Sequence, residues 1–217
     1  LFTELGIKQK LYDSKPSIPL IASAPAQESA TTIIKTFIKV ARENEAGVIA
    51  DLDTEFLHDY RVSFRKVRSV LSLFKGIFTQ EDTENLKREF ADIMQSTNRL
   101  RDLDVYLLER DNYFELIPQS SQEGLVTLFD YLEKERKAEH KQVTRTLKSK
   151  GYASRINTLE KMFSKGKLPA GPRGDLGSLE FGAQLILKRY RQVCKIAHTI
   201  DANTADEIVH ELRISCK

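Results

Sequence analysis

Apolar residues recur at intervals of three and four positions along most of the chain after residue 29. This spacing places them on one side of a helix and is typical of amphipathic α-helices. No segment carries the alternating apolar and polar residues of a half-buried strand. The pattern predicts an all-α fold with helices over residues 29–46, 54–78, 81–110, 122–149, 152–164 and 179–199, a break around Gly47, and a further helix that starts after Asp206.

Two stretches rich in proline or glycine divide these helices into groups. Residues 1–28 contain three of the six prolines, which predicts a linker or the tail of an upstream domain. Residues 166–178 predict a loop between a first helical bundle at 29–165 and the start of a second bundle at 179–217. The chain begins without methionine, and its last predicted helix is cut off by the chain end, so we expect it to be a fragment.

A short sequence occurs twice, at an offset of 152 residues. The first copy runs from His58 to Arg65 (HDYRVSFR) and the second from His210 to Lys217 (HELRISCK). The histidine, the arginine three positions later and the serine are identical, while an acid, an aliphatic residue and a base are conservatively matched. Internal similarity of this kind indicates repeated structural units. We therefore predict two related helical bundles packed about a pseudo-twofold axis, with the second bundle incomplete in this chain.

The predicted helix at 54–78 has a one-sided distribution of bases. At about 100° per residue, His58, Arg61, Arg65 and Arg68 share a sector of about 80°, separate from the apolar stripe. A solvated helix face normally alternates charges, with acids placed four residues from bases. Like charges stacked on one face repel one another. The pattern therefore indicates either acids supplied by neighbouring helices or a site for a polyanion.

Further charged residues stand out on the later helices. Arg101 and Asp104 fall within the apolar stripe of the 81–110 helix, where an unpaired charge would be costly. They are expected to pair with each other, to pair with another helix, or to face a polar cavity. Arg136 and His140 share one face of the 122–149 helix. On the helix at 179–199, two lysines lie opposite the apolar residues: Lys188 and Lys195.

Composition excludes several classes of protein. The 34 basic and 31 acidic residues give a net charge of only +3, less than the excess usual in proteins that coat nucleic acid. The two cysteines, Cys194 and Cys216, form no CxxC pair, which disfavours a thiol redox motif or a cysteine-built zinc site. Their small number fits a reducing compartment, and we expect a cytoplasmic location. No apolar run approaches the length that spans a membrane.

The basic helix resembles the signature helix of the CHAD domain, the conserved histidine α-helical domain. In that signature a histidine, here His58, is followed by bases at i+3, i+7, i+8 and i+10. All four bases are present: Arg61, Arg65, Lys66 and Arg68. Three later segments resemble further motifs of the family, in the same order along the chain: Arg101–Asp104, Glu135–His140 and His210–Lys217. The resemblance covers about residues 30–217.

This resemblance implies two antiparallel four-helix bundles with a basic cavity or channel between them that binds inorganic polyphosphate without catalysis. It implies no cofactor, metal or catalytic residue, and it allows association with polyphosphate granules. Family members are often fused behind a CYTH domain, so an upstream CYTH-type domain is a further implied partner. The candidate polyphosphate-binding residues are His58, Arg61, Arg65, Lys66, Arg68, Arg101, Arg136, His140, Lys188, Lys195, His210, Arg213 and Lys217.

Three other functions stay open. His58 and Asp59 resemble the ligand pair of HD-type metal phosphohydrolases, although adjacent helical residues point about 100° apart and the nearby arginines would repel a cation. Nonspecific nucleic-acid binding uses the same phosphate contacts, but tryptophan is absent and most aromatic residues fall on buried stripes, which disfavours base stacking. A purely structural helical scaffold is the third. The sequence indicates no specific nucleic-acid partner, no membrane partner and no particular oligomeric state.

Overall fold

A computed structural model describes residues 13–164 and 168–216, and within these residues the chain is all-α, as predicted. Three parts of the chain lie outside the described residues: residues 1–12 of the predicted linker, residues 165–167, the last two of which belong to the predicted loop, and the candidate site residue Lys217. No helix of the described part is long and apolar enough to cross a bilayer.

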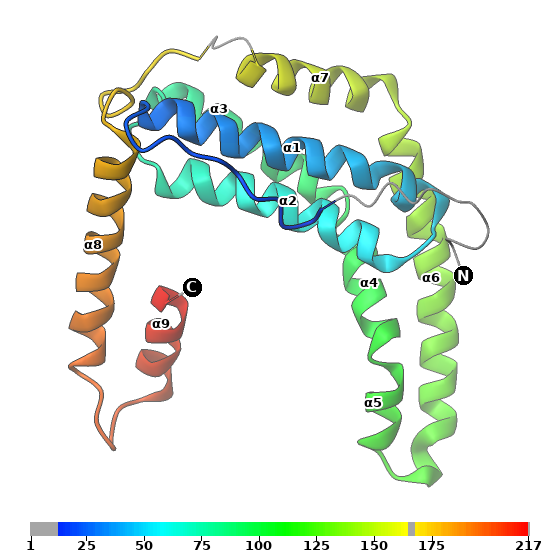
Figure 1. The fold of residues 1–217 in the computed structure, drawn as a ribbon. Helices are drawn as coiled ribbons and strands as arrows, with labels where there is room; N and C mark the ends of the chain where they lie inside the picture. The colour runs from blue at the N-terminus through cyan, green and yellow to red at the C-terminus, as the bar shows by residue number, and fades with distance from the viewer. Residues whose placement is uncertain (1–12, 165–167, 217) are drawn as a thin grey trace, which may run out of the picture.

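Nine α-helices and one short 3₁₀ helix follow one another along the described residues. Their bounds are α1 Ala26–Ala50, α2 Thr54–Leu73, α3 Gln80–Gln95, α4 Asn98–Leu108, α5 Arg110–Glu115, η1 Gln119–Ser121, α6 Gln122–Leu147, α7 Lys150–Ser164, α8 Ser178–Ala197 and α9 Asp206–Cys216. Figure 1 shows α1, α2 and α3 as one layer, with α7 running along it. The arm formed by α4, α5 and α6 projects from one end of this layer, and α8 with α9 projects from the other.

The core lies where α1, α2, α3 and α7 meet. The apolar stripe predicted for the 54–78 segment faces this core, and the aromatic rings of Tyr60 and Phe64 meet edge to face with centroids 4.9 Å apart. Removing such side chains from water is the main source of stability in a fold of this kind. Five of the side chains with no exposed surface show how the four helices contribute: Ile34, Tyr60, Phe64, Phe90 and Ile156.

The first helix differs from the prediction at both ends. It begins at Ala26, inside the predicted linker, and it passes through Gly47 to end at Ala50. Glycine weakens a helix without necessarily ending it, and its missing side chain lets a neighbouring residue come close to the helix backbone. Here the ring of Phe56 lies so close that a Cβ atom on Gly47 would be 2.3 Å from it. The glycine therefore marks a close approach between α1 and α2, and the predicted break was wrong.

Two predicted helices are shorter than expected. The 54–78 segment is helical only to Leu73, and the 81–110 segment divides into α3 and α4 around Ser96 and Thr97. The side-chain hydroxyl groups of Ser96 and Thr97 donate to the carbonyl oxygens of Ile93 and Met94. Such local hydrogen bonds compete with the regular helical pattern. Apolar periodicity continues across the division, which is why the sequence predicted a single helix.

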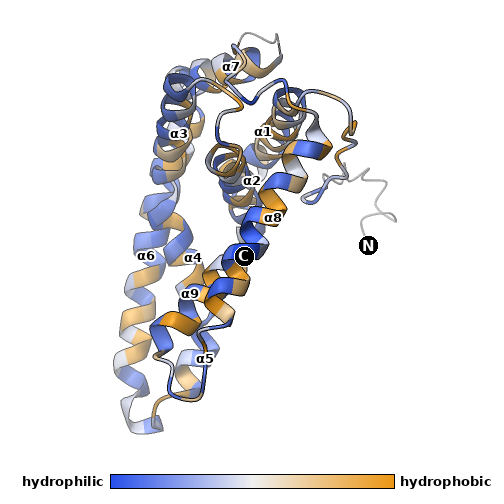
Figure 2. Cartoon of the chain, turned by 90° about the vertical axis from the view of Figure 1, so that its left-hand side faces the viewer, coloured by the Kyte–Doolittle hydropathy of each residue, from blue (hydrophilic) through white to orange (hydrophobic). Residues whose placement is uncertain are grey.

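The helices α8 and α9 bury much less of their apolar surface than the first part of the chain. Figure 2 shows the apolar residues of α8 along a helix with few neighbours. Ile186 and Tyr190 are 73% and 64% exposed, whereas Ile34 and Ile38 of α1 are almost fully buried. Ile186 and Tyr190 lie 152 residues after Ile34 and Ile38, respectively. Positions that are buried in α1 are therefore exposed at the equivalent places of α8 in the described chain.

Candidate functional site

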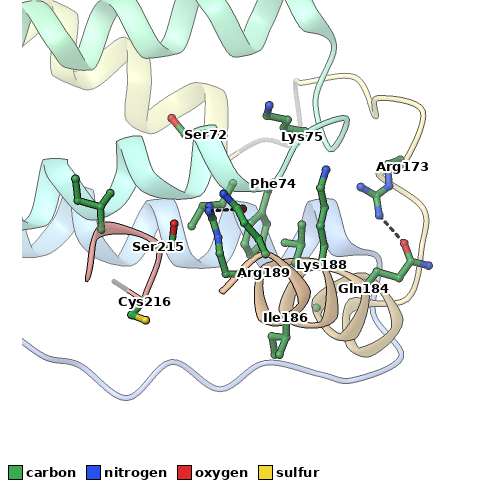
Figure 3. Close-up of a pocket in the computed structure, with 15 residues that line it drawn as sticks. Ser72, Phe74, Lys75, Arg173, Gln184, Ile186, Lys188, Arg189, Ser215 and Cys216 are labelled. Carbon is green, nitrogen blue, oxygen red and sulfur yellow. Dashed lines mark hydrogen bonds between the residues drawn. The ribbon is translucent and has the colours of Figure 1, made fainter. Parts of the chain in front are cut away.

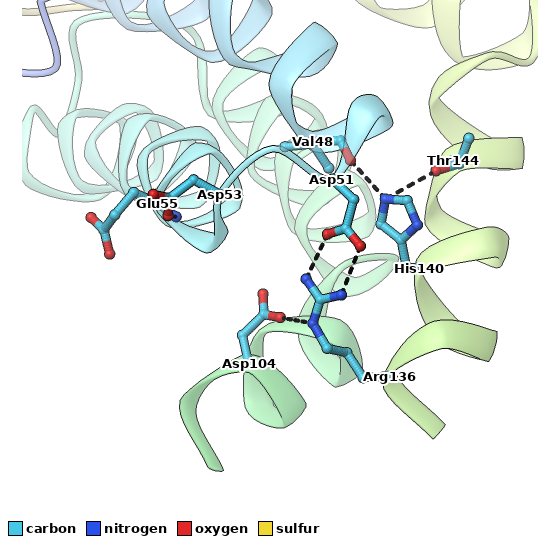
Figure 4. A network of polar contacts seen from close by, with 8 residues as sticks. All are labelled: Val48, Asp51, Asp53, Glu55, Asp104, Arg136, His140 and Thr144. Atoms are coloured by element: carbon cyan, nitrogen blue, oxygen red, sulfur yellow. Dashed lines mark hydrogen bonds and ion pairs between the residues drawn. The ribbon is translucent and has the colours of Figure 1, made fainter. Parts of the chain in front are cut away.

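The basic face of α2 is fixed by the way this helix starts. Asp53 occupies the N-cap position, and its carboxylate accepts a hydrogen bond of 2.8 Å from the backbone N–H of Glu55 (Figure 4). A carboxylate at the N-cap position satisfies one of the backbone donors of the first helical turn. From this start, the buried apolar stripe packs on α1 and α3 and leaves His58 and Arg61 half-buried and Arg65 exposed.

Two arginines of this face lean toward the end of α3. Nη1 of Arg61 donates to the carbonyl oxygen of Met94 at 3.0 Å and to Oγ1 of Thr97 at 2.7 Å. Nη1 of Arg68 lies 3.9 Å from the sulfur of Met94. Arg61 and Arg68 thus approach the same residue of α3, and the sequence prediction that they share one surface agrees with this placement.

The acidic partners that would make this face an ordinary salt-bridged surface are missing from the described residues. No carboxylate oxygen in that part of the chain lies within 4.0 Å of a side-chain nitrogen of Arg61, Arg65, Arg68 or Arg101. By contrast, Arg42 pairs with Glu160 at 3.2 Å, and Arg155 pairs with Asp92 at 3.1 Å. We call Arg61, Arg65, Arg68 and Arg101 the arginine cluster.

Electrostatics show that members of this cluster lie close enough to repel one another. Burial lowers the pKa of the Arg61 guanidinium, and the charges of Arg65 and Arg101 lower it further, while Asp102 opposes them. Nε of Arg61 and Nη1 of Arg101 are buried without a hydrogen-bond partner in the described residues. Unsatisfied buried donors are uncommon in folded proteins. Guanidinium groups arranged in this way suit an anion with several acceptor oxygens.

Lys66 does not join the arginine cluster. Its ammonium group stands over the ring of Phe37 on α1, 4.5 Å from the ring centroid. This cation–π contact occupies the lysine on the α1 side of the helix. The prediction that Lys66 acts with Arg61 and Arg65 is therefore not supported by its position.

Arg136 serves a different network, in which its donors are already used (Figure 4). Nη1 and Nη2 donate to the two carboxylate oxygens of Asp51 at 2.8 and 2.6 Å, and Nε donates to Asp104 at 2.7 Å. Asp104 is 1% exposed, so Arg136 compensates a buried charge. The sequence left open whether Asp104 pairs with Arg101, pairs with another helix or faces a polar cavity. The structure shows that it pairs with another helix, α6. We reassign Arg136 from anion binding to support of the fold.

Ion pairing and burial act on the pKa values of this network in opposite directions. Hydrogen bonds from Arg136 lower the pKa of Asp51 against the effect of burial, whereas burial raises the pKa of Asp104 against the effect of Arg136. The same hydrogen bond to Asp51 is the main cause that raises the pKa of Arg136. Arg136 therefore stays charged and paired.

His140 also has a structural partner. Its Nε2 lies 2.8 Å from the carbonyl oxygen of Val48, a contact in which Nε2 carries the proton. Val48 lies in the last turn of α1, and its carbonyl oxygen accepts this hydrogen bond in addition to one of 3.2 Å from the backbone N–H of Asp51. We therefore reassign His140 to the junction between α1 and α6, together with Arg136.

The remaining candidate residues belong to α8 and α9. Lys188, Lys195, His210 and Arg213 are exposed. Of these, only Lys188 lines a cavity of about 890 Å³ between α8, α9 and the end of α2 (Figure 3). None of the described residues that line it is acidic. Three further cations line the cavity and were not among the residues predicted from the sequence: Lys75, Arg173 and Arg189. The dibasic pair at 188–189 was an available signal for Arg189, and the sequence offered none for the other two.

One group of side chains offers ligand atoms for a metal ion in the described part of the chain. Atoms of Glu55, His58 and Asp59 lie within 4.8 Å of one another. All three residues come from a single stretch of α2, Glu55 is exposed, and no second helix of the described chain contributes a ligand. Hydrolytic metal sites need a ligand set fixed from several directions and a positioned substrate. This group does not provide that set.

The chain is similar to known proteins in its sequence family and in its fold. The CHAD domain family matches residues 32–217, and no curated protein matches the chain. The crystal structure of the CHAD domain from the plant Ricinus communis has a TM-score of 0.66 and 22% identity, covering 92% of this chain and 65% of that one. PptA from Streptomyces chartreusis has a TM-score of 0.63 and 12% identity, covering 88% of this chain and 72% of that one.

These two likenesses establish the shared helical fold, and this chain spans less than two-thirds of the plant domain, at 65% of its length. The family match includes the basic helix α2, the arginine cluster and the helices α8 and α9. Since that match extends over most of the chain, the protein belongs to the CHAD domain family.

Proposed function

We propose that this chain binds inorganic polyphosphate without catalysis, and that the arginine cluster is the main contact surface. The observation that carries the proposal is the absence of carboxylate partners around four neighbouring arginines in the described residues, of which Arg65 and Arg68 are exposed. Membership of the CHAD domain family supports it, because the ligand implied by the sequence resemblance is the same polyanion.

The chemistry of the cluster favours a linear phosphate polymer over a single small anion. A guanidinium group presents several N–H donors in a plane and forms bidentate hydrogen bonds with phosphate oxygens. Arg61, Arg65 and Arg68 follow one another along one side of α2, so successive phosphate groups of a chain can engage successive arginines. A compact ligand such as pyrophosphate would reach fewer of them and gain less.

The exposed cations of α8 and α9 extend the proposed surface. We include His58 on α2 and, from the second part of the chain, Lys188, Lys195, His210, Arg213 and Lys217, the last of which lies outside the described residues. An upstream CYTH-type domain and association with polyphosphate granules remain parts of the proposal that derive from the family resemblance. The arginine cluster is the part that can be tested directly.

The first experiment measures binding by titration calorimetry with long-chain polyphosphate at about 150 mM salt, the physiological ionic strength. The test variant carries Arg65→Glu and Arg68→Glu, two exposed positions of the cluster. The control carries Arg88→Glu and Arg145→Glu, two exposed arginines outside the cluster, so both variants change the net charge equally. We expect the test variant to lose binding and the control to retain it. Equal weakening of both would contradict a localised site.

Two comparators separate the alternative functions. Single-stranded DNA tests nonspecific nucleic-acid binding, and its displacement of polyphosphate at the same salt concentration would favour that function. Phosphate release from polyphosphate in the presence of Mg²⁺ or Mn²⁺ tests hydrolysis. Release that is lost in His58→Ala but kept after Arg65→Glu would favour the metal group on α2 over the arginine cluster.

Salt dependence provides a second measure of the same contacts. Binding to a linear polyanion releases counterions, so the logarithm of the binding constant falls linearly with the logarithm of salt concentration. Removing one phosphate contact reduces that slope by about one. Arg65→Gln should reduce it in this way, while Arg88→Gln should leave it unchanged.

A further inference from the structure

Thr97 lies at the division between α3 and α4 and is fully buried. Its hydroxyl oxygen accepts a hydrogen bond of 2.7 Å from Nη1 of Arg61 and donates one of 2.9 Å to the carbonyl oxygen of Met94. The same Nη1 donates to that carbonyl at 3.0 Å. Arg61, Thr97 and Met94 thus form a closed triangle of hydrogen bonds.

The hydroxyl group of Thr97 is not used in the way its place in the chain suggests. Thr97 is the N-cap residue of α4, a position where a threonine side chain usually accepts a hydrogen bond from the backbone of the first turn. No such hydrogen bond forms here. The side chain instead points its acceptor at the guanidinium of α2. A role in starting α4 therefore does not account for the hydroxyl group.

The division between the two helices also supplies the second contact of Arg61. Met94 lies in the last turn of α3, where carbonyl oxygens lack partners within the helix and carry partial negative charge. One side of the guanidinium is held by this carbonyl and by Thr97. Nη2, on the other side, has no hydrogen-bond partner among the described residues. A side chain held in this way loses less conformational freedom when its remaining donors bind an anion.

We propose that Thr97 is a positioning residue of the polyphosphate surface, because its hydroxyl fixes Arg61 with Nη2 left available beside Arg65 and Arg101. This inference rests on the proposed function. Thr97 itself does not contact the ligand, and it acts through Arg61.

The test compares Thr97→Val, which replaces the hydroxyl with a methyl group, with Thr97→Ser, which keeps it. Loss of one hydrogen bond to Arg61 should weaken long-chain polyphosphate binding about three- to tenfold in Thr97→Val, while Thr97→Ser should bind like the unmodified chain. Thr36→Val is the matched control, because the Thr36 hydroxyl donates to a helix carbonyl, that of Thr32, without an arginine partner. Urea unfolding of each variant shows the folded fraction used in the titration.

A double-mutant cycle separates positioning from a general structural effect. In an Arg61→Met background, Thr97→Val should cause no further loss of affinity. An equal loss in both backgrounds would overturn the inference, as would unchanged affinity of Thr97→Val in the otherwise unmodified chain. The Arg65→Glu, Arg68→Glu variant would still lose binding in that case, and the proposed function would stand.

Failure of the proposed function gives a different result. If the unmodified chain does not bind polyphosphate, the anion-binding role of Arg61 and the contribution of Thr97 to that binding are both refuted. The hydrogen bond between Thr97 and Arg61 can then still be tested by the NMR signals of the Arg61 guanidinium in ¹⁵N-labelled protein. Ordered signals that broaden in Thr97→Val but not in Thr97→Ser would show that Thr97 holds the arginine, and unchanged signals would show that it does not.

Discussion

Pro25 and Gly177 pair with each other as an isolated antiparallel bridge, and they are separated by the same 152 residues as His58 and His210. The peptide groups beside this bridge exchange hydrogen bonds in both directions, at the same length of 2.8 Å: Ala26 N to Leu176 O, and Ser178 N to Ala24 O. A second exchange follows at 3.0 Å: Gln27 N to Gly174 O, and Leu179 N to Ala22 O. Contacts in which residue i meets j and the equivalent of j meets the equivalent of i are characteristic of a twofold-related interface.

The same offset relates the starts of two pairs of helices. It connects α1 with α8, which begin at Ala26 and Ser178, and α2 with α9, which begin at Thr54 and Asp206. The pseudo-twofold repeat stays a prediction, and these relationships match it. In the predicted arrangement the axis would pass close to the bridge between Pro25 and Gly177, because that bridge joins equivalent residues.

The reciprocal hydrogen bonds of Ala26 and Ser178 predict that these two backbone amides exchange their hydrogens at similar rates. The amides of Ala26 and Ser178 become exposed only when the same two segments separate, so they belong to one opening unit. We expect their protection factors to agree closely and to change together in urea. Amide exchange followed by NMR measures this. Much faster exchange at Ser178 than at Ala26 would show that the two segments do not open as a unit.

Replacing Arg136 should destabilise the fold without weakening polyphosphate binding. Arg136→Met leaves the carboxylate of Asp104, which is 1% exposed, without its charge partner. Breaking a buried ion pair in this way lowers the unfolding free energy by about 3 kcal/mol. Arg99→Met is the control, since Arg99 is 59% exposed where it pairs with Glu135, and an exposed pair contributes less than about 1 kcal/mol.

Urea unfolding measures these two changes, and calorimetry of the folded variants measures affinity. A loss of polyphosphate affinity in Arg136→Met at unchanged stability would contradict the structural role assigned to Arg136. It would return that residue to the binding surface predicted from the sequence.

Glu45 should make stability depend on pH in the mildly acidic range. Burial raises the pKa of its carboxyl above 4.5, although the hydroxyl of Tyr152, which donates to it at 2.6 Å, acts in the opposite direction. The folded state therefore binds this proton more tightly than the unfolded state does. Its contribution to the unfolding free energy is complete below the unfolded pKa and is lost as pH rises through the folded pKa.

Glu45→Gln should remove this decline in the unfolding free energy with rising pH. The variant should therefore differ least in stability from the unmodified chain at low pH and become relatively more stable as pH rises. Urea unfolding at a series of pH values from about 4 to 7 covers the unfolded pKa of a glutamate. Glu43→Gln, at a neighbouring surface position paired with Lys39, should leave the decline in place. A decline of the same size in Glu45→Gln would assign it to another group.

Two glycines in helices should respond to alanine in opposite ways. Gly124 of α6 has no atom within 4 Å of an added Cβ, so Gly124→Ala should raise the unfolding free energy by about 0.5–1 kcal/mol through the better helix propensity of alanine. An added Cβ on Gly47 would be 2.3 Å from the ring of Phe56. Gly47→Ala should therefore lower stability by about 1–3 kcal/mol, as overpacking does. Thermal or urea unfolding measures both changes in stability. Stabilisation by Gly47→Ala would refute the close approach between Gly47 and the ring of Phe56.

The sequence by itself determined the all-α class and the buried and basic faces of α2, although several helix ends were predicted wrongly. The spacing of Tyr60, Phe64 and Val67 identified the buried side of α2, and the positions of Arg61 and Arg65 separated the basic side from it. Helix formation and facing depend on residues within one or two turns of each other, so a local pattern contains that information. The offset between His58 and His210 was likewise readable without coordinates, because a repeat is a property of the sequence.

Only the tertiary structure decided which charges are compensated. Arg61 and Arg136 are both arginines on predicted basic faces, yet Arg136 is held by Asp51 and Asp104 while Arg61 has no carboxylate partner in the described residues. Asp51 lies 85 residues from Arg136, and no local pattern reports which distant segments will pack together. The close approach at Gly47 likewise depends on how α1 meets α2 in space. Pairing and fit are properties of the packed helices, and they determined which of the predicted bases remain available for an anion.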